Sequence, residues 1–201
     1  VKQARRVEME YFRAKNVWTK KPRAEAIRKT GKPPITVKWV DVNKGDSANP
    51  NYRSRLVAKE FNTGVNHDLY AATPPSECLR LMLSMLASSR HKGTTLMYAD
   101  VSRAYFYAKA ERPVYVKLPE EDREKGDENK CGRLRMCMYG TRDAGKLWED
   151  CYTQVLEGMG FRTCILNLCT FHHPGRHIST VVHCGGFTAL GLDDHLDWHE
   201  V

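Results

Sequence analysis

The stretch of sequence most able to do chemistry is centred on Asp100. Apolar or nearly apolar residues at 96–99 lead into this single carboxylate, and a predicted turn follows it. The pattern is typical of a buried strand with an acid at its end, where the carboxylate can bind a divalent metal ion while it stays ionised. An aspartate in this place also serves as a turn former or a helix N-cap. Asp100 alone therefore leaves both interpretations open.

A second group of candidate residues lies upstream, in a predicted hairpin. Residues 35–42 and 52–61 have the composition of two strands, and a turn-rich segment joins them. Arg53, Arg55 and Lys59 alternate along the second strand, which sends all three side chains to one face. Such a basic row either faces solvent or meets the phosphates of a triphosphate.

Helices are predicted to support these strands. Residues 1–18 have helical spacing, and a basic linker punctuated by prolines follows up to residue 34. Ser76 is the expected N-cap of another helix, and residues 142–160 carry an apolar stripe that a glycine closes. The acidic segment 120–130 lacks periodicity and is expected to be exposed. The helix after Ser76 has a predicted core stripe of Leu79, Met82, Leu83 and Leu86.

The charge is distributed unevenly along the chain. Residues 1–60 hold sixteen Lys and Arg against six Asp and Glu, a net +10, whereas the remainder has a net −2. A basic front half indicates a polyanionic partner such as nucleic acid, or else a solvated basic face. Because Arg80 and Ser84 interrupt the longest apolar run, we expect no membrane span.

The seven cysteines indicate reduced thiols. Their number is odd and no Cys-x-x-Cys pattern occurs, which favours a cytoplasmic or nuclear location. A zinc site is an alternative, although its ligand spacing fits no usual zinc motif. Its candidate ligands are Cys164, Cys169, His172, His173 and His177.

Two segments resemble sequence motifs of polymerases. Residues 100–106 resemble motif A, in which an aromatic residue follows the aspartate after five positions. Residues 139–148 resemble motif B, with a glycine at position 145 where proline is usual. The landmarks of motif B found here are Tyr139, Gly140, Ala144 and Trp148. Together with the hairpins, in the same order along nearly the whole chain, these motifs resemble the reverse transcriptase of copia-type retrotransposons.

The resemblance implies an RNA-directed DNA polymerase that binds a template–primer and deoxynucleoside triphosphates. Such enzymes use two Mg²⁺ ions about 3.5–4 Å apart. Asp100 would bind both ions, with the Val101 carbonyl nearby, and Tyr105 would be the steric gate against a ribose 2′-hydroxyl. Backbone N–H groups of Arg103 and Ala104 would receive the triphosphate.

Two further residues gain roles from the same resemblance. Arg55, with Arg53 or Lys59, would clamp phosphate oxygens. Gly140 would let the backbone approach the nascent base pair or the template.

The second pair of metal-binding acids, motif C, is the part of the pattern that is missing. Motif C places two aspartates at the turn between apolar strands, and Gly185 and Gly186 occupy that place in a predicted two-residue turn. Asp193 and Asp194 are the alternative, but the polar stretch 195–200 that follows them starts a helix better than a strand. We expect motif C at the glycines, with its acids lost.

The expected fold is α+β. Residues 1–34 would form an N-terminal helix and basic linker, and residues 35–201 the fingers and palm, with a mainly antiparallel sheet backed by helices. Since the chain runs from Val1 to Val201 and stops before a thumb, we expect a fragment of a Pol polyprotein. With one of three acids left, we expect this copy not to polymerise. The alternatives are a non-catalytic nucleic-acid-binding remnant and a small zinc-binding module.

Overall fold

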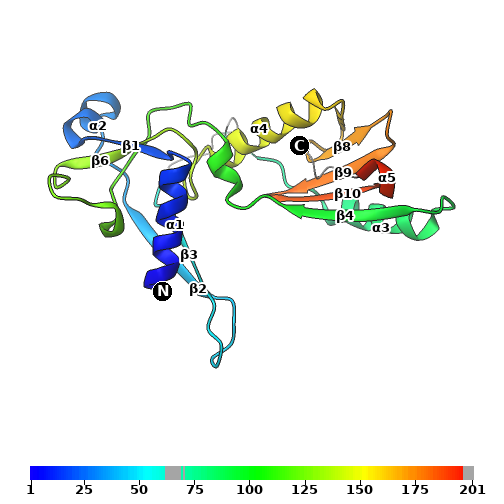
Figure 1. Ribbon diagram of the computed structural model, residues 1–201. Helices are drawn as coiled ribbons and strands as arrows, with labels where there is room; N and C mark the ends of the chain where they lie inside the picture. Colours follow the sequence, from blue (N-terminus) through cyan, green and yellow to red (C-terminus); the bar gives the residue numbers. More distant parts are fainter. Residues whose placement is uncertain (62–68, 70, 197–201) are drawn as a thin grey trace. The chain divides into compact units, whose positions relative to one another are not determined.

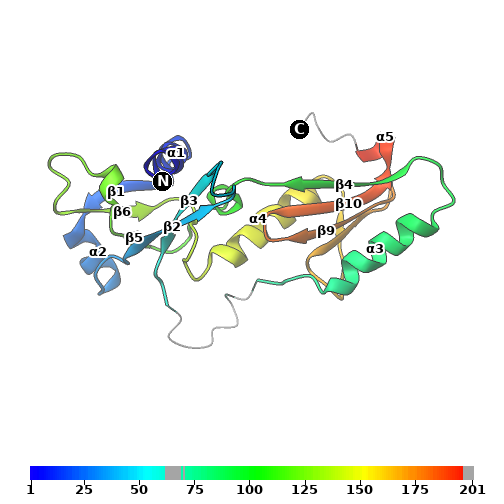
Figure 2. The same ribbon diagram turned by 90° about the horizontal axis from the view of Figure 1, so that it is seen from below.

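The computed structural model describes residues 1–61, 69 and 71–196, and the chain divides into two compact units. Unit 1 combines Val1–Leu69 with Tyr105–Leu147, and unit 2 combines Tyr70–Ala104 with Trp148–Val201. Each unit has antiparallel strands with helices packed on them (Figures 1 and 2). The predicted α+β class is confirmed.

Unit 1 contains two small antiparallel sheets, with strand orders β1-β6-β5 and β2-β3. Two 3₁₀ turns, η2 (Ala104–Tyr107) and η3 (Glu120–Asp122), accompany them. The bounds of the other elements, in chain order, are α1 (Lys2–Ala14), β1 (Trp18–Pro22), α2 (Arg23–Thr30), β2 (Val37–Asn43), β3 (Tyr52–Ala58), β5 (Tyr115–Val116) and β6 (Lys130–Leu134).

The hairpin β2–β3 confirms the predicted pair of strands. Side chains along β3 alternate between its two faces. Leu56 and Ala58 are buried, whereas Arg53 and Arg55 are exposed on the opposite face of the hairpin. Exposed Lys59 directly follows the strand, and its N–H donates to the carbonyl of Thr36 at 2.8 Å.

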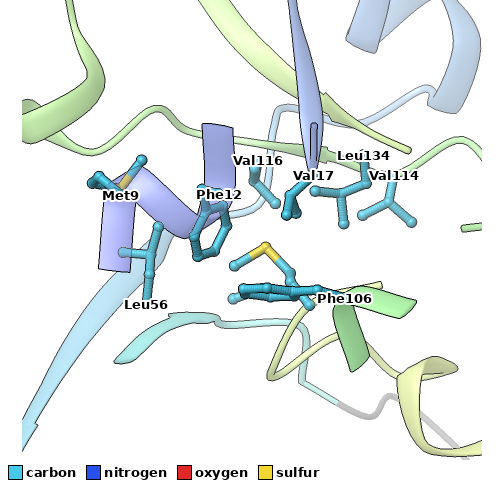
Figure 3. Close-up of a cluster of buried hydrophobic side chains, with 10 residues drawn as sticks. Met9, Phe12, Val17, Leu56, Phe106, Val114, Val116 and Leu134 are labelled. Atoms are coloured by element: carbon cyan, nitrogen blue, oxygen red, sulfur yellow. The ribbon is translucent and has the colours of Figure 1, made fainter. Parts of the chain in front are cut away.

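The core of unit 1 joins α1 to segments far away in sequence. The rings of Phe12 and Phe106 meet edge to face, with centroids 4.7 Å apart. Figure 3 shows Met9 and Leu56 on one side of Phe12, and Val17 toward Leu134 on the other. All the side chains of this cluster are less than 5% exposed, so helix α1 forms an integral part of unit 1.

The segment predicted as a basic linker forms β1 and α2 instead. Strand β1 pairs along its whole length with β6, and Ala26 of α2 is buried against Tyr115 and Cys131. Helix α2 ends at Gly31, whose φ of 67° is the left-handed conformation that glycine adopts freely. Tertiary packing thus stabilises a helix whose own sequence signal is weak.

The acidic segment 120–130 was predicted to be exposed, but two of its carboxylates are buried. Asp122 accepts hydrogen bonds from Arg13 Nε and Trp18 Nε1, both at 3.1 Å. Asp127 accepts from the ammonium groups of Lys20 at 2.6 Å and Lys130 at 2.9 Å. These partners neutralise the acids and hold the loop against β1 and α1.

Unit 2 is built around a five-stranded antiparallel sheet with strand order β4-β10-β9-β8-β7. Helix α4 (Ala144–Gly158) confirms the predicted helix 142–160, and the boundary between the units falls within it and within η2. The other elements, in chain order, are α3 (Ser76–Ser88), β4 (Thr94–Asp100), β7 (Arg162–Thr163), β8 (Thr170–His173), β9 (Ile178–His183), β10 (Gly186–Leu192) and α5 (Asp193–Leu196).

Helices α3 and α4 cover opposite faces of this sheet (Figure 1). Met82 of α3 packs with Leu190 of β10. Trp148 and Tyr152 of α4 pack edge to face on Phe187 of the same strand. Because Phe187 and Leu190 are three residues apart, they point to opposite faces.

The predicted core stripe of α3 is wrong in part. Met82 is buried and Leu86 partly buried, but Leu79 and Leu83 are 43% and 48% exposed. The helix is rotated so that Met82 and Leu86 face the sheet, together with Cys78. Ser76 is the first helical residue rather than the N-cap, which is Pro75.

None of the helices in the described part of the chain combines the length and the apolar character that crossing a bilayer requires.

Candidate functional site

Asp100 is the last residue of β4, as predicted, and its side chain is exposed at the end of the sheet of unit 2. Strand β10 runs antiparallel beside it, with Gly186 opposite Asp100 and Ala99 opposite Phe187. The N–H of Val101 donates to the carbonyl of Gly185 at 2.8 Å, which continues the pairing by one residue. The sheet therefore brings the predicted motif A acid to the predicted motif C turn.

The turn of this hairpin lies one residue earlier than predicted. Gly186 pairs with His183, so the two turn residues are Cys184 and Gly185, and Gly186 begins β10. Cys184 has a φ of 56°, a left-handed conformation that is uncommon for residues other than glycine. Trp148 of α4 donates its indole N–H to the carbonyl of Cys184 at 2.5 Å, which anchors the turn.

Side chains at positions 185 and 186 would both lie near Asp100, since Gly186 is opposite Asp100 and such residues point to the same face of the sheet. A Cβ atom at Gly185 would lie 3.4 Å from Oδ1 of Asp100 and 3.0 Å from the Val101 carbonyl oxygen. A Cβ at Gly186 would instead lie 2.9 Å from the hydroxyl oxygen of Tyr98. The Tyr98 side chain is 65% exposed and can move aside. A carboxylate at 185 would thus adjoin that of Asp100.

Asp193 and Asp194 lie at the other end of the sheet. They form the first turn of α5, which directly follows Leu192, and Leu192 pairs with Thr94 at the start of β4. A seven-residue strand at about 3.4 Å per residue separates them from Asp100 by about 20 Å. The helix predicted for residues 195–200 begins two residues earlier, at Asp193, and its described part ends at Leu196, while residues 197–200 lie outside the described residues. The structure does not bring these acids to Asp100.

The turn after Asp100 places the other predicted groups of unit 2. Arg103 has a φ of 55°, and Ala104 is buried at 6% exposure. Val101 is half-buried, and its carbonyl oxygen lies near Gly185. The Asp100 carboxylate and the Val101 carbonyl are two oxygen ligands available to a cation.

In unit 1 the structure brings together three predicted residues from different segments. The guanidinium carbon of Arg55 lies 5.3 Å from the ring centroid of Tyr139, a cation–π geometry. The ring of Tyr105 meets Tyr139 edge on, with centroids 4.9 Å apart. Tyr139 of motif B thus contacts both Arg55 of the hairpin and Tyr105 of motif A.

Gly140 follows Tyr139 with a φ of 81° and lies against strand β3. A Cβ atom here would lie 2.0 Å from the carbonyl oxygen of Ala58 and 2.6 Å from Cγ1 of Val57. The N–H of Ala58 donates to the Tyr139 carbonyl at 2.8 Å. The close approach that the structure shows at Gly140 is therefore to the protein's own backbone.

Arg112, which was not predicted as a site residue, connects three segments of unit 1. Its guanidinium donates to Glu60 Oε1 at 2.7 Å and to Asp143 Oδ2 at 2.8 Å, while the N–H of Arg142 donates to Glu60 Oε2 at 2.9 Å. Burial alone would lower the pKa of Arg112, but the hydrogen bonds to both carboxylates outweigh it and raise that pKa. Nothing local in the sequence signals contacts between residues this far apart, although Asp143 lies within the motif B segment.

The described residues contain no group of three or more His, Cys, Asp or Glu side chains placed to hold a metal ion. The five candidate zinc ligands are therefore not gathered into a site, and all seven cysteines are free thiols. One carboxylate and one carbonyl, from Asp100 and Val101, do not fit a pair of magnesium ions, which need several oxygen ligands each.

A family model described as reverse transcriptase (RNA-dependent DNA polymerase) matches residues 26–180. The match includes Arg55, Asp100, Tyr105 and Gly140, and it ends before the turn at Cys184 and Gly185. It covers well over half of the chain, in agreement with the resemblance at motifs A and B. The chain belongs to the reverse transcriptase (RNA-dependent DNA polymerase) family.

Proposed function

We propose that this chain is the reverse transcriptase region of a copia-type retrotransposon Pol polyprotein, in a copy that has lost its polymerase activity. Reverse transcriptases bind a nucleic-acid template and deoxynucleoside triphosphates, and they use divalent metal ions. In this proposal residues 35–201 are fingers and palm, residues 1–34 are an N-terminal addition, and the protein acts inside the cell.

One observation supports the loss of activity. The sheet places Gly186 opposite Asp100 and Gly185 beside the Asp100 carboxylate, where a second acid would have to stand. Two-metal catalysis depends on several carboxylates that hold the ions and the developing charge. With glycines at 185 and 186, Asp100 lacks these partners.

The remaining roles in the proposal belong to side chains and amides around the two motifs. Asp100 and the Val101 carbonyl would be the surviving metal ligands, and Tyr105 the gate against a 2′-hydroxyl. Arg55 and the N–H groups of Arg103 and Ala104 would bind the triphosphate, with Gly140 shaping the motif B loop.

Primer extension on an RNA template tests the proposal. The chain as given is expected to add no nucleotides in Mg²⁺, and the variant carrying Gly185→Asp and Gly186→Asp is the comparison. Extension by the unchanged chain that disappears on Asp193→Asn would overturn the placement of motif C.

A second candidate function, a non-catalytic nucleic-acid-binding remnant, is favoured by the net charge of +10 that residues 1–60 carry. Its mark is salt-dependent binding of RNA or DNA without magnesium-dependent extension.

A further inference from the structure

A hollow of about 440 Å³ lies beside strand β2 in unit 1, and it is here named the β2 hollow. Residues 36–39 form one wall, and residues 117–121 form the other. The two walls are joined by hydrogen bonds. The N–H of Lys117 donates to the carbonyl of Ile35 at 2.8 Å, and the indole N–H of Trp39 donates to Glu121 Oε2 at 3.0 Å. The hollow is therefore part of the folded unit, and a ligand need not order it.

The edge of β2 that faces the hollow has main-chain groups without a strand partner. Ile35, two residues before Val37, directs both its N–H and its C=O away from β3, to the segment 115–117. Because main-chain groups alternate along a strand, Val37, Trp39 and Asp41 direct theirs the same way. Among the described residues β2 pairs only with β3, so these three residues meet no other strand. The edge can therefore accept a further strand.

Pro119 explains why the chain itself does not fill this edge. The bridge between Ile35 and Val116 is parallel, so the segment after Val116 would continue beside β2 if it stayed extended. Pro119 has no N–H to donate, and the 3₁₀ turn η3 begins at the next residue. The ladder stops here, and the hollow lies where it would have continued.

Cations outnumber acids around the β2 hollow. Its two acids are Glu120 and Glu121, and Glu121 is paired with Arg5 at 3.2 Å. Within the described part of the chain, four further lining cations form no ion pair. These four are Lys38, Lys59, Lys117 and Arg123. A ligand that enters the hollow is therefore expected to be acidic.

Apolar side chains flank the same edge. Trp39 and Leu118 line the hollow. Val40 and Val42 are 37% and 43% exposed, on the face of the hairpin that also carries Arg55. A strand added to β2 would place its own side chains directly beside these, where β-branched residues pack well.

We propose that the edge of β2 and its hollow bind an extended, acidic segment of a partner protein, which adds to β2 as a further strand. The main-chain groups of Val37, Trp39 and Asp41 would bond to the segment, and the lysines of the hollow would meet its carboxylates. A nucleic acid could also use the cations, but it has no alternating N–H and C=O groups to pair with the edge. The inference goes beyond the proposed function and does not rest on it.

The test is fluorescence anisotropy of the whole chain with a labelled seven-residue peptide in which valine and glutamate alternate. Saturable binding is expected, and it should weaken as salt is raised. Two further peptides carry N-methyl groups, one on every valine and the other on every glutamate. Only one of these two sets of N–H groups can face β2 in an added strand. One methylated peptide should therefore bind at least about tenfold more weakly, and the other should stay within about threefold.

A double variant tests whether the peptide lies at the hollow. Lys38→Gln with Lys117→Gln removes one cation from each wall and should weaken binding at least about fourfold. The matched control, Arg28→Gln with Lys29→Gln, removes the same charge from the exposed surface of α2, outside the hollow. It should change the affinity less than twofold. Circular dichroism and the urea midpoint check that both variants are folded.

Four results would overturn the proposal. The first is no binding of the acidic peptide, and the second is equal affinity of the two methylated peptides, because strand addition would then be absent. The third is an equal loss in both double variants, because binding would then follow overall charge. The fourth is a single-stranded oligonucleotide that displaces the labelled peptide more effectively than the unlabelled peptide does. Primer extension involves neither the peptide nor the edge of β2, so failure of the proposed function would be seen separately.

Discussion

Gly186 lies opposite Asp100 in the β4–β10 pair, and the adjoining Gly185 would place a Cβ atom 3.4 Å from the Asp100 carboxylate. We therefore expect Gly185→Asp to create a divalent-metal site in unit 2. Without metal the two carboxylates repel each other, so the variant should have a lower melting temperature than the unchanged chain. At a Mg²⁺ concentration about ten times the dissociation constant, binding should restore about 1.4 kcal/mol. Thermal unfolding with and without MgCl₂ measures this difference.

The control for this variant is Gly185→Asn, which has the same size and crowds the Val101 carbonyl equally, but carries no charge. Adding Asp100→Asn to Gly185→Asp should abolish the Mg²⁺ response. A melting temperature that rises equally with Mg²⁺ in all these proteins would contradict the prediction.

Gly140→Ala should destabilise unit 1 by about 2–5 kcal/mol, because it combines a positive φ with a Cβ atom 2.0 Å from the Ala58 carbonyl oxygen. Gly31→Ala is the matched comparison, since its φ is 67° and no atom lies within 4 Å of its Cβ position. That variant should cost only about 1 kcal/mol. Urea unfolding followed by tryptophan fluorescence gives both values. Equal losses would show that crowding against β3 does not determine the requirement for glycine.

Arg112→Ala should cost about 2 kcal/mol of stability, since it leaves Glu60 and Asp143 without their shared cation. The loss is smaller than for a fully buried pair because the Arg112 side chain is 37% exposed. The stability of Arg112→Lys should lie between that of Arg112→Ala and that of the unchanged chain, because an ammonium group cannot bind both carboxylates in the same geometry. Arg53→Ala, on the exposed face of the hairpin, should change the urea midpoint little. A similar loss in Arg53→Ala would contradict a specific role for Arg112.

Asp127 should make the stability of unit 1 sensitive to acid. Hydrogen bonds from Lys20 and Lys130 hold its pKa well below the ordinary value of 3.8. The unfolded chain therefore binds a proton near pH 4 that the folded chain does not. This contribution to stability is present above about pH 4 and is lost as the pH falls further.

Asp127→Asn removes that contribution, so its urea midpoint should be lower than that of the unchanged chain at pH 6. The difference should shrink as the pH is lowered from 5 toward 3. Glu10→Gln, on the exposed side of α1, serves as the control and should follow the unchanged chain at every pH. A gap between Asp127→Asn and the unchanged chain that stays constant with pH would contradict the assigned cause.

Local sequence patterns predicted the elements well but not their rotation. In α3 both the Leu79–Leu83 stripe and the Cys78–Met82 stripe have helical spacing, and periodicity does not determine which one faces the sheet. The turn at Cys184 and Gly185 lies one residue earlier than predicted for the same kind of reason. Cross-strand pairing fixes the register, and composition does not.

What the sequence could not predict depends on contacts between distant segments. Asp122 and Asp127 are buried because cations about a hundred residues away reach them. The link from Arg112 to Glu60 spans 52 residues. Helix α2 was missed because only Ala26 among its eight residues is buried, so the helix has no apolar stripe, although Gly31 after it is a recognisable helix end. The position of Asp100 at the end of a strand could be predicted because the apolar residues before it and the turn after it lie in one short segment.

The hydrogen bond from Trp148 to the Cys184 carbonyl has an evolutionary consequence. It holds the turn through the main chain, together with the bond from Val101 to Gly185, so neither of these two bonds depends on a side chain at 185 or 186. A mutation can therefore change the side chain at position 185 or 186 while these two main-chain hydrogen bonds remain. Aspartate and glycine codons differ by a single base, so an exchange between the two residues at either position needs one mutation and leaves both main-chain hydrogen bonds possible.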